Sequence, residues 1–530
     1  LPRQIIQLAD MATSNSKSSP FPALRDGMSS NAMADPVCDE KAKVKLEHAD
    51  QASEEEKNPH RLASVTAPIE ALGLEDWQKL EKKLVRRLDM TLMPMLWVLY
   101  LFNYLDRASI SQARLSSFEA DLGLTDTQFA TAVAVLVPGY VAAQIPSNMI
   151  LPYVRPSIYL PCCALVWSGV SAATAGVKNY NGLVACRVVL GLCEAPLLPG
   201  AIYIMSCWYT RKEIALRTAI LYTGLVLAMA SSGLIAAGVY SGLEGARGMA
   251  GWQWLFVVLA LAGSCCALIA LVLLPDYPHS KTGSAWWSMT EDMRRLAVAR
   301  IQADRVSLPQ AESNSIWYGL KLTCMDYKTW IFVAINISIS AAYGFLNFFP
   351  SIVRGFGFES RTTTLLLTAP PYVFAALASL CNARSSDHFK ERGCHMVGPV
   401  AIAILGYIVC TATANVPARY AASFLYIGGM FAANPLINTW LVGTLGRTPE
   451  KRATAIPVIN VLGQIGNVIA PYFFPDRDEP RYLMAFFLMI GFAAIGIACC
   501  LLLKFILVRS NKKLWTNAQE EGTVYNPYTL

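Results

Sequence analysis

The sequence predicts an all-α membrane protein in which twelve transmembrane helices form two six-helix bundles. Three observations predict this fold class. The 530 residues are 54% hydrophobic and only 15% charged, whereas soluble proteins carry about 25% charged residues. The apolar residues fall into twelve runs of roughly 20 residues, the length of helix that crosses a bilayer. One long polar segment, 275–328, separates six runs from the other six.

The elements are expected in the following order. Residues 1–85 are rich in Ser, Ala, Lys, Glu and Pro without an apolar period, which predicts a disordered tail. A first bundle over 86–274 and a second over 329–508 flank the central loop at 275–328, where an amphipathic helix is expected near 290–304, and 509–530 forms a C-terminal tail. The expected spans are 89–110, 127–150, 157–177, 181–206, 216–239, 252–274, 329–351, 362–383, 396–414, 420–444, 453–474 and 482–508.

The distribution of Lys and Arg predicts the orientation, because cytoplasmic flanks are enriched in both residues. The first span follows a basic stretch, Lys79–Arg87, and the last span precedes Arg509, Lys512 and Lys513. Both termini are therefore expected in the cytoplasm. The short loops on the opposite side also carry arginines, so the tails and the central loop decide the orientation.

Composition and motifs exclude several other classes of protein. Most of the fourteen cysteines lie in or beside the spans, where Cys acts as a small apolar residue, and no spacing predicts a metal site or a disulfide framework. There is no Walker lysine motif, so an ATP-driven pump is not expected. No nucleophile–base pattern of an enzyme is visible, and no cofactor is expected. The net charge of +7 resides in the flanks and does not predict nucleic-acid binding.

Four charged residues stand inside apolar spans of the first half. Asp106 and Arg107 are adjacent in the first span, and Arg187 and Glu194 lie in the fourth. Charged side chains in hydrocarbon are costly, so they usually mark a transport pathway or a proton relay. Two acids and two arginines together favour a site that moves an anion with protons. The structural alternative is that buried ion pairs only join helices, with little net gain in stability.

Helical geometry limits how these four groups can meet. Adjacent residues point about 100° apart, so Asp106 and Arg107 face different neighbours. Arg187 and Glu194 share one face but lie roughly 10 Å apart along the helix, so either could instead pair with the first span, for example Arg187 with Asp106. Glu194 lies near the middle of the membrane, where burial favours the neutral form of a carboxyl group. A carboxyl group that alternates between neutral and charged forms is what proton coupling requires.

Several short motifs occur in order between about residue 85 and residue 508. They are Leu105–Arg107, Gln144–Asn148, Arg187–Gly200, Ser206–Tyr209, Gly251–Phe256, Leu274–Pro278, Asn347–Pro350, Thr368–Tyr372 and Gly463–Asn467. Together they resemble the motifs of the major facilitator superfamily and, more narrowly, of its anion:cation symporter family, which includes fungal allantoate, nicotinate and pantothenate permeases.

The resemblance implies a role for each charged residue. Asp106 and Glu194 would be the proton-binding acids. Arg107 would contact the carboxylate of the substrate or orient Asp106, and Arg187 would be the partner of Glu194. The loop after the second span keeps little of the superfamily's gating signature. The equivalent loop of the second half is closer to it, so Asp387 and Arg392 are gating candidates, with a merely solvated loop as the alternative.

The apolar cores of the last six spans hold no acidic residue, so their polar candidates are neutral. Tyr343, Asn347, Asn438 and Gln464 are expected to line a cavity and to bind a polar organic molecule through hydrogen bonds. The alternative is that such side chains join helices to one another.

These observations predict a secondary active transporter of a small organic anion, a carboxylate, coupled to protons in symport by alternating access. It is expected to act as a monomer in the plasma membrane. Its partners would be the anion, protons and the lipid bilayer. Two alternatives stay open: a proton-coupled exporter of a secondary metabolite or toxic compound, and a transporter-like nutrient receptor that signals through its tail.

Overall fold

The structure, a computed structural model, describes residues 74–278, 280, 282–284, 288–306, 316–358, 360–445, 449–521 and 528. The first half contains α4 (Leu74–Ala113), α5 (Phe118–Leu122), α6 (Asp126–Ala134), α7 (Leu136–Ile150), η2 (Leu151–Tyr153), α8 (Pro156–Thr174), α9 (Tyr180–Glu194), α10 (Leu197–Trp208), α11 (Arg211–Leu243), η3 (Ala246–Gly248) and α12 (Gly251–Leu273). The connecting segment contains α14 (Glu291–Val306) and α15 (Ile316–Met325).

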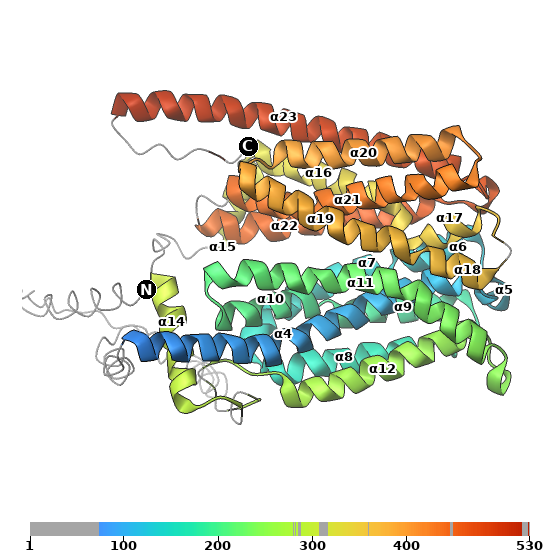
Figure 1. Ribbon diagram of the computed structural model, residues 1–530, viewed down its shortest axis with the longest axis horizontal. Helices are drawn as coiled ribbons and strands as arrows, with labels where there is room; N and C mark the ends of the chain where they lie inside the picture. The colour runs from blue at the N-terminus through green and yellow to red at the C-terminus, as the bar shows by residue number, and fades with distance from the viewer. Residues whose placement is uncertain are drawn as a thin grey trace, which may run out of the picture.

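The second half continues the same all-helical pattern. It contains α16 (Tyr327–Ala342), η4 (Gly344–Asn347), α17 (Phe349–Arg354), α18 (Arg361–Leu367), α19 (Ala369–Phe389), α20 (Gly393–Ala412), α21 (Val416–Leu445), α22 (Pro449–Ile469), η5 (Ala470–Phe473), η6 (Asp476–Asp478) and α23 (Leu483–Glu521). The two halves form two layers of roughly parallel helices that lie side by side (Figure 1).

Eleven helical segments among the described residues are long and apolar enough to cross a membrane. They correspond to every expected span except the second, 127–150, which is present as two shorter helices, α6 and α7, separated at Val135. Pro138 explains this division, because a proline has no N–H to bond the carbonyl four residues earlier and its ring crowds that carbonyl. Pro199 has the same effect on the fourth span, which is divided between α9 and α10.

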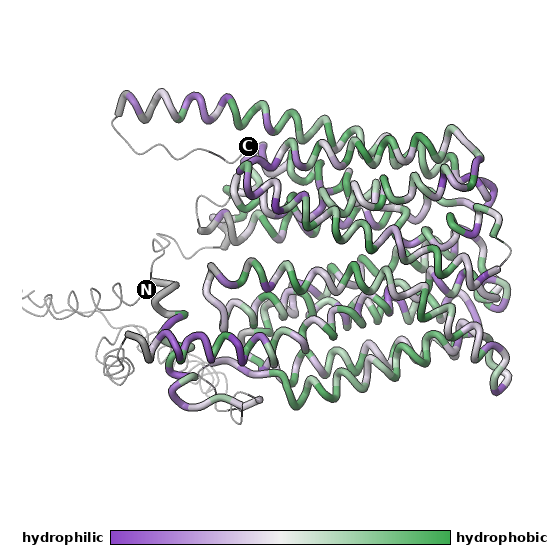
Figure 2. Tube along the Cα trace, viewed as in Figure 1, coloured by the Kyte–Doolittle hydropathy of each residue, from purple (hydrophilic) through white to green (hydrophobic). Residues whose placement is uncertain are grey.

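The ends of the bundle differ in composition and connectivity. The start of α4 and the end of α23 lie at one end, together with α14 and α15 (Figure 1). We call this the terminal end and the opposite one the distal end. Hydrophilic residues gather at the terminal end, whereas hydrophobic residues cover most of the helix length (Figure 2). Such a distribution is typical of a protein that spans a bilayer.

One boundary differs from the expected one. Helix α4 begins at Leu74, inside the range expected to be a tail, so the basic stretch Lys79–Arg87 continues directly into the first span.

The helix expected near 290–304 is α14, and Arg300 fixes it to the first half. The fully buried Arg300 side chain donates to Glu213 at 3.1 Å and to the carbonyl oxygen of Trp208 at 2.8 Å. Helix α15 instead joins the second half, where the hydroxyls of Thr323 and Thr454 are 2.7 Å apart.

The contacts between the two halves that involve described side chains gather toward the distal end. Arg361 of α18 pairs with Glu244, which follows α11, at 2.7 Å, and its guanidinium lies over the ring of Tyr240. The hydroxyls of Thr131 on α6 and Tyr472 on η5 are 3.1 Å apart. Helices α6 and α11 of the first half therefore meet α18 and η5 of the second at this end.

Candidate functional site

The first span places its two charged side chains in different environments. Asp106 is 1% exposed, and its Oδ1 accepts a hydrogen bond from the hydroxyl of Ser171 on α8 at 2.9 Å. Arg107, the next residue of α4, turns toward α7 and α9, as the rotation of about 100° per residue requires. Its Nε donates to Oε2 of Glu194 at 2.6 Å. The first span thus contacts α8 through Asp106 and α9 through Arg107.

Glu194 is the last residue of α9 and lies where the fourth span is interrupted. Its side chain has no exposed surface, whereas that of Arg107 is 22% exposed. Close packing of α7 on α9 fixes this part of the bundle: a Cβ added to Gly191 would lie 2.2 Å from the carbonyl oxygen of Leu136. Only glycine permits this approach. The same packing brings Tyr140 of α7 toward Arg107.

Arg107 is held between aromatic rings as well as by Glu194. Its guanidinium carbon lies 4.7 Å from the ring centroid of Tyr140 and 5.2 Å from that of Tyr104. Cation–π contacts of this kind stabilise a charge that has been withdrawn from water. Arg107 is therefore a preorganised cation that keeps some exposed surface, and it is the most accessible of the four charged groups.

Among the described residues, Arg187 forms no hydrogen bond or ion pair with Glu194 or Asp106, although both acids lie near enough to interact with its charge. Its side chain is buried, and the guanidinium carbon lies 6.0 Å from the ring centroid of Phe256. Among the described residues, its Nε and Nη2 atoms have no hydrogen-bond partner. Glu194 pairs across to Arg107 instead, because two helical turns separate Arg187 and Glu194 on the same face.

Several buried polar atoms around these charges make no hydrogen bond of good geometry among the described residues, although Trp167 interacts with Asp106 and Asn103 with Glu194. They come from α4, α8 and α9: Asn103 Nδ2, Asp106 Oδ2, Trp167 Nε1, Arg187 Nε and Nη2, and Glu194 Oε1. Buried polar atoms are normally satisfied by protein, water or a ligand. This group of unsatisfied atoms, which we call the charged cluster, is therefore suited to hold water, a proton or a polar guest.

The second-half candidates are dispersed. The Tyr343 hydroxyl is buried without a partner among the described residues, and its ring stacks on Phe345 at 5.6 Å. Asn347 is half-buried in η4, and Gln464 accepts a hydrogen bond from Asn467 at 2.7 Å. Asn438 is exposed on α21. No hydrogen bond between described residues joins these four side chains to the charged cluster, so their contact with a substrate stays a prediction.

Both loops considered for gating contain ion pairs at the terminal end. Arg392 pairs with Asp387 at 2.6 Å and donates to Ser386 at 3.0 Å, within the α19–α20 connection. In the first half, Arg155 pairs with Asp276 at 3.0 Å. Asp276 was not singled out from the sequence, because an acid just after a span is ordinary. The motif Leu274–Pro278 was the only signal that could have pointed to it.

Asp276 joins the segment that follows α12 to the start of α8. Its buried carboxylate accepts from the Ser157 backbone N–H at 3.0 Å, and also from Arg155 and Thr282. Burial alone would raise the pKa of this carboxyl group, but the hydrogen bonds from Ser157, Thr282 and Arg155 outweigh burial and hold the pKa below its ordinary value. The ionised Asp276 carboxylate therefore stabilises the fold at pH values above the ordinary pKa of an aspartate. This stabilisation is lost as pH falls through the lower pKa that Asp276 has in the folded protein.

We expect Asp276→Ala to lower the free energy of unfolding by about 3 kcal/mol, because a buried N–H loses its acceptor and Arg155 loses its counter-ion. Thermal unfolding of the purified protein in detergent at neutral pH measures the effect. Asp292→Ala, on the exposed face of α14, is the matched control. Equal melting temperatures for the two variants would contradict the assignment.

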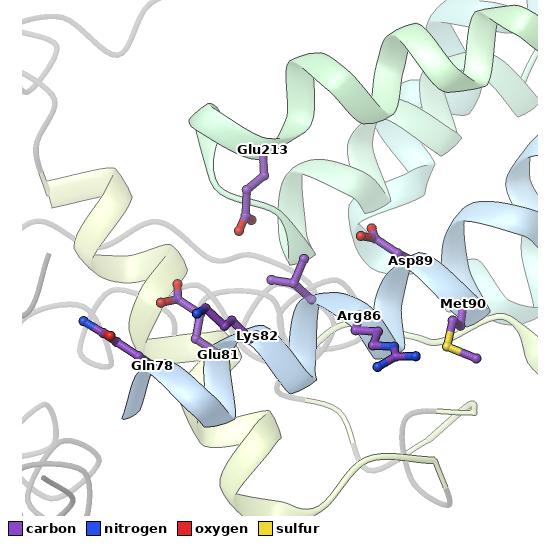
Figure 3. A pocket seen from close by; sticks show the side chains of 8 residues that line it. Gln78, Glu81, Lys82, Arg86, Asp89, Met90 and Glu213 are labelled. Carbon is purple, nitrogen blue, oxygen red and sulfur yellow. The ribbon is translucent and has the colours of Figure 1, made fainter. Parts of the chain in front are cut away.

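A separate hollow of about 540 Å³ opens at the terminal end between the start of α4 and the start of α11 (Figure 3). Charged side chains of both signs line it, and several are already paired. Glu213 binds Arg300, and Asp89 binds Arg217 at 2.8 Å. These ion pairs hold α14 and α11 in place, which gives the charged residues a structural role. We therefore do not assign the transport site to this hollow. Among the described residues, no group of three or more His, Cys, Asp or Glu side chains is placed to hold a metal ion.

Two bundles of membrane-spanning helices, with charged groups buried in the first, define a membrane transporter. The sequence profile of the Major Facilitator Superfamily matches residues 96–471. The chain belongs to this superfamily and is a transporter, not an enzyme.

Similar proteins agree with this assignment. The MFS-type transporter cnsO of Penicillium expansum is 30% identical over 82% of this chain and 84% of its own. The major facilitator-type transporter hxnP of Emericella nidulans is 28% identical over 76% and 81% of the two chains. A bacterial homologue of the human lysosomal transporter Spinster, inward-facing and unoccupied, superposes with a TM-score of 0.63 at 17% identity, covering 79% of this chain and 97% of its own. A D-xylose–proton symporter gives 0.58 at 14% identity, covering 78% and 96%.

Proposed function

We propose that this transporter carries a small organic anion together with protons, as a symporter of the anion:cation type. The ion pair between Arg107 and Glu194 supports this proposal most directly, because it joins a partly exposed cation to a wholly buried acid. An incoming carboxylate can replace Glu194 as the counter-ion of Arg107. Glu194 is then left in an apolar site, where it takes up a proton.

Charge balance favours the anion and the proton moving together. Asp106, Arg107, Arg187 and Glu194 together carry no net formal charge. One anion and one proton leave that sum unchanged, so the loaded site can change its access without placing a net charge in the membrane. In this scheme Asp106 is a second acid that can bind the proton, and Arg187 is a cation that balances the charge of the acids. Their unsatisfied atoms hold the water through which the proton arrives.

The terminal end is proposed to face the cytosol and the distal end the outside of the plasma membrane. The basic flanks Lys79–Arg87 and Arg509–Lys513 lie at the terminal end, as expected for cytosolic segments. Contacts between the halves gather at the distal end, as is expected of an inward-facing state in an alternating-access cycle. Asp387 and Arg392 then belong to the cytosolic gate.

Transport assays on a panel of labelled organic acids test the proposal. Cells that express the protein are expected to concentrate one or more carboxylates when the medium is acidic, and to lose this ability when a protonophore collapses the gradient. Neutral analogues of the same size, such as the corresponding amides, serve as the matched control. Faster efflux of preloaded acid would identify an exporter. Equal transport of acid and amide, without dependence on the gradient, would contradict the proposal.

A further inference from the structure

One arginine at the distal end contacts both halves of the molecule. The Arg114 side chain is only 4% exposed, and its Nε lies 2.8 Å from Oε1 of Glu119 in its own half. On the other side it pairs with Asp476 of η6, in the second half. Its guanidinium carbon also lies 4.7 Å from the ring centroid of Phe129 and 5.5 Å from that of Phe348, one ring from each half. Separation of the halves would break the contacts with Asp476 and Phe348.

Acidic groups outnumber this single cation. The backbone N–H of Asp476 donates to Oδ2 of Asp126 at 2.6 Å, which brings two carboxyl groups from opposite halves together. The titratable and charged groups that face Asp476 and Arg114 are Glu119, Asp126, Glu479 and Tyr482. Closing the halves therefore gathers negative charge around one guanidinium, and the repulsion between carboxylates is relieved if one of them is protonated.

A small hollow between the two halves lies close to this contact. Ser111 is one turn of α4 before Arg114 and is 3% exposed. It lines a hollow of about 10 Å³, the size of one water molecule, together with Gln112 and with Thr368 and Tyr372 of the second half. The Ser111 hydroxyl and Gln112 Oε1 have no hydrogen-bond partner among the described residues. Polar atoms left unsatisfied between the halves are suited to line a passage when the halves part.

We propose that Arg114 closes the distal gate, defined as Arg114, Glu119, Asp126 and Asp476, by binding Asp476 across the two halves, and that a rise in pH on that side opens it. This inference goes beyond the proposed function. It requires only that the distal end opens at some stage of transport, and it does not depend on which substrate is carried or on the role of Glu194.

The chemistry of Asp476 supports the direction of the pH effect. Burial and the contact with Asp126 raise the pKa of Asp476 to about 7, against the opposing effect of Arg114. A protonated Asp476 can accept from Arg114 with one oxygen and donate to Asp126 with the other. When the halves separate, its pKa returns toward the ordinary value of about 4, so the closed state binds the proton more tightly. Closure is therefore favoured at low pH and weakens as pH rises through about 7.

Labelling of a thiol beneath the gate tests the proposal. The reporter is the variant Ser111→Cys, labelled with a membrane-impermeant maleimide in vesicles of both orientations. The signal is the labelling of this variant minus the labelling of the protein that keeps Ser111. Adding Arg114→Gln is expected to increase labelling from the distal side about tenfold, the shift expected from losing a charge-assisted hydrogen bond. Arg354→Gln, an exposed arginine at the same end, is the matched control and should leave labelling unchanged.

Two variants of Asp476 complete the test. Asp476→Ala removes the partner in the second half but leaves the pair with Glu119, so it should increase labelling even if Arg114→Gln does not fold. Asp476→Asn keeps an acceptor for Arg114 and should stay closed, while losing the rise in labelling between about pH 5 and 8. Labelling equal to that of the control in both Arg114→Gln and Asp476→Ala would overturn the proposal, as would unchanged pH dependence in Asp476→Asn. The vesicle orientation that admits the label tests the proposed membrane orientation separately.

Discussion

Glu194→Gln is expected to abolish proton-driven accumulation of the transported anion while leaving exchange of labelled for unlabelled anion across the membrane. Glutamine can still accept the hydrogen bond of Arg107, so the site keeps its shape, but it cannot take up and release a proton. A symporter that moves one proton with each anion can concentrate substrate about tenfold for each unit of pH difference. In the variant this ratio should fall to one.

The experiment compares net uptake and exchange in proteoliposomes with an imposed pH gradient. Glu291→Gln, on the exposed face of α14, is the matched control, because it removes an acid far from the charged cluster. Loss of both uptake and exchange with normal folding would assign Glu194 a structural role. Normal accumulation by Glu194→Gln would show that the proton binds elsewhere.

Arg107→Lys is expected to raise the KM for the anion about 10- to 100-fold with a smaller effect on the maximum rate. Lysine keeps the charge, but it loses the planar fork that binds a carboxylate with two hydrogen bonds and that stacks between Tyr104 and Tyr140. Arg107→Ala should reduce uptake to background, because it also leaves Glu194 buried without a counter-ion.

Saturation curves of uptake separate substrate binding from a structural role for Arg107. If Arg107 served only as the counter-ion of Glu194, lysine would restore transport with an unchanged KM. Arg86→Lys, on the exposed face of α4, should behave as the unaltered protein and serves as the matched control. An unchanged KM in Arg107→Lys would remove Arg107 from the substrate site.

The buried charged residues could be identified from the sequence, because each stands in a long apolar run where a charged side chain is unusual. Asp106, Arg187 and Glu194 stand in apolar runs, and the structure buries all three. Their pairing could not be predicted, since it depends on how far each helix is rotated and on how closely α7 approaches α9 at Gly191. The hydrogen bond of Asp106 to Ser171 also joins spans that are distant in the sequence.

Residues outside the apolar runs carried no comparable signal. Arg114 and Asp476 are separated by more than half the chain, and each is an ordinary charged residue near the end of a span. The interruption of the second span at Val135 was equally hidden, because its apolar run continues past Pro138 without a polar residue. Hydropathy therefore predicted the spans and the buried charges, whereas breaks in helices and contacts between halves required coordinates.

Proton movement that accompanies the anion distinguishes symport from transport of the anion alone. Proteoliposomes that contain a pH-sensitive dye report acidification of the interior when an anion found in the uptake panel is added outside. Symport through Glu194 predicts acidification in proportion to the anion that enters, and none with Glu194→Gln. Entry of the anion through the unaltered protein without acidification, or equal acidification with Glu194→Gln, would contradict it.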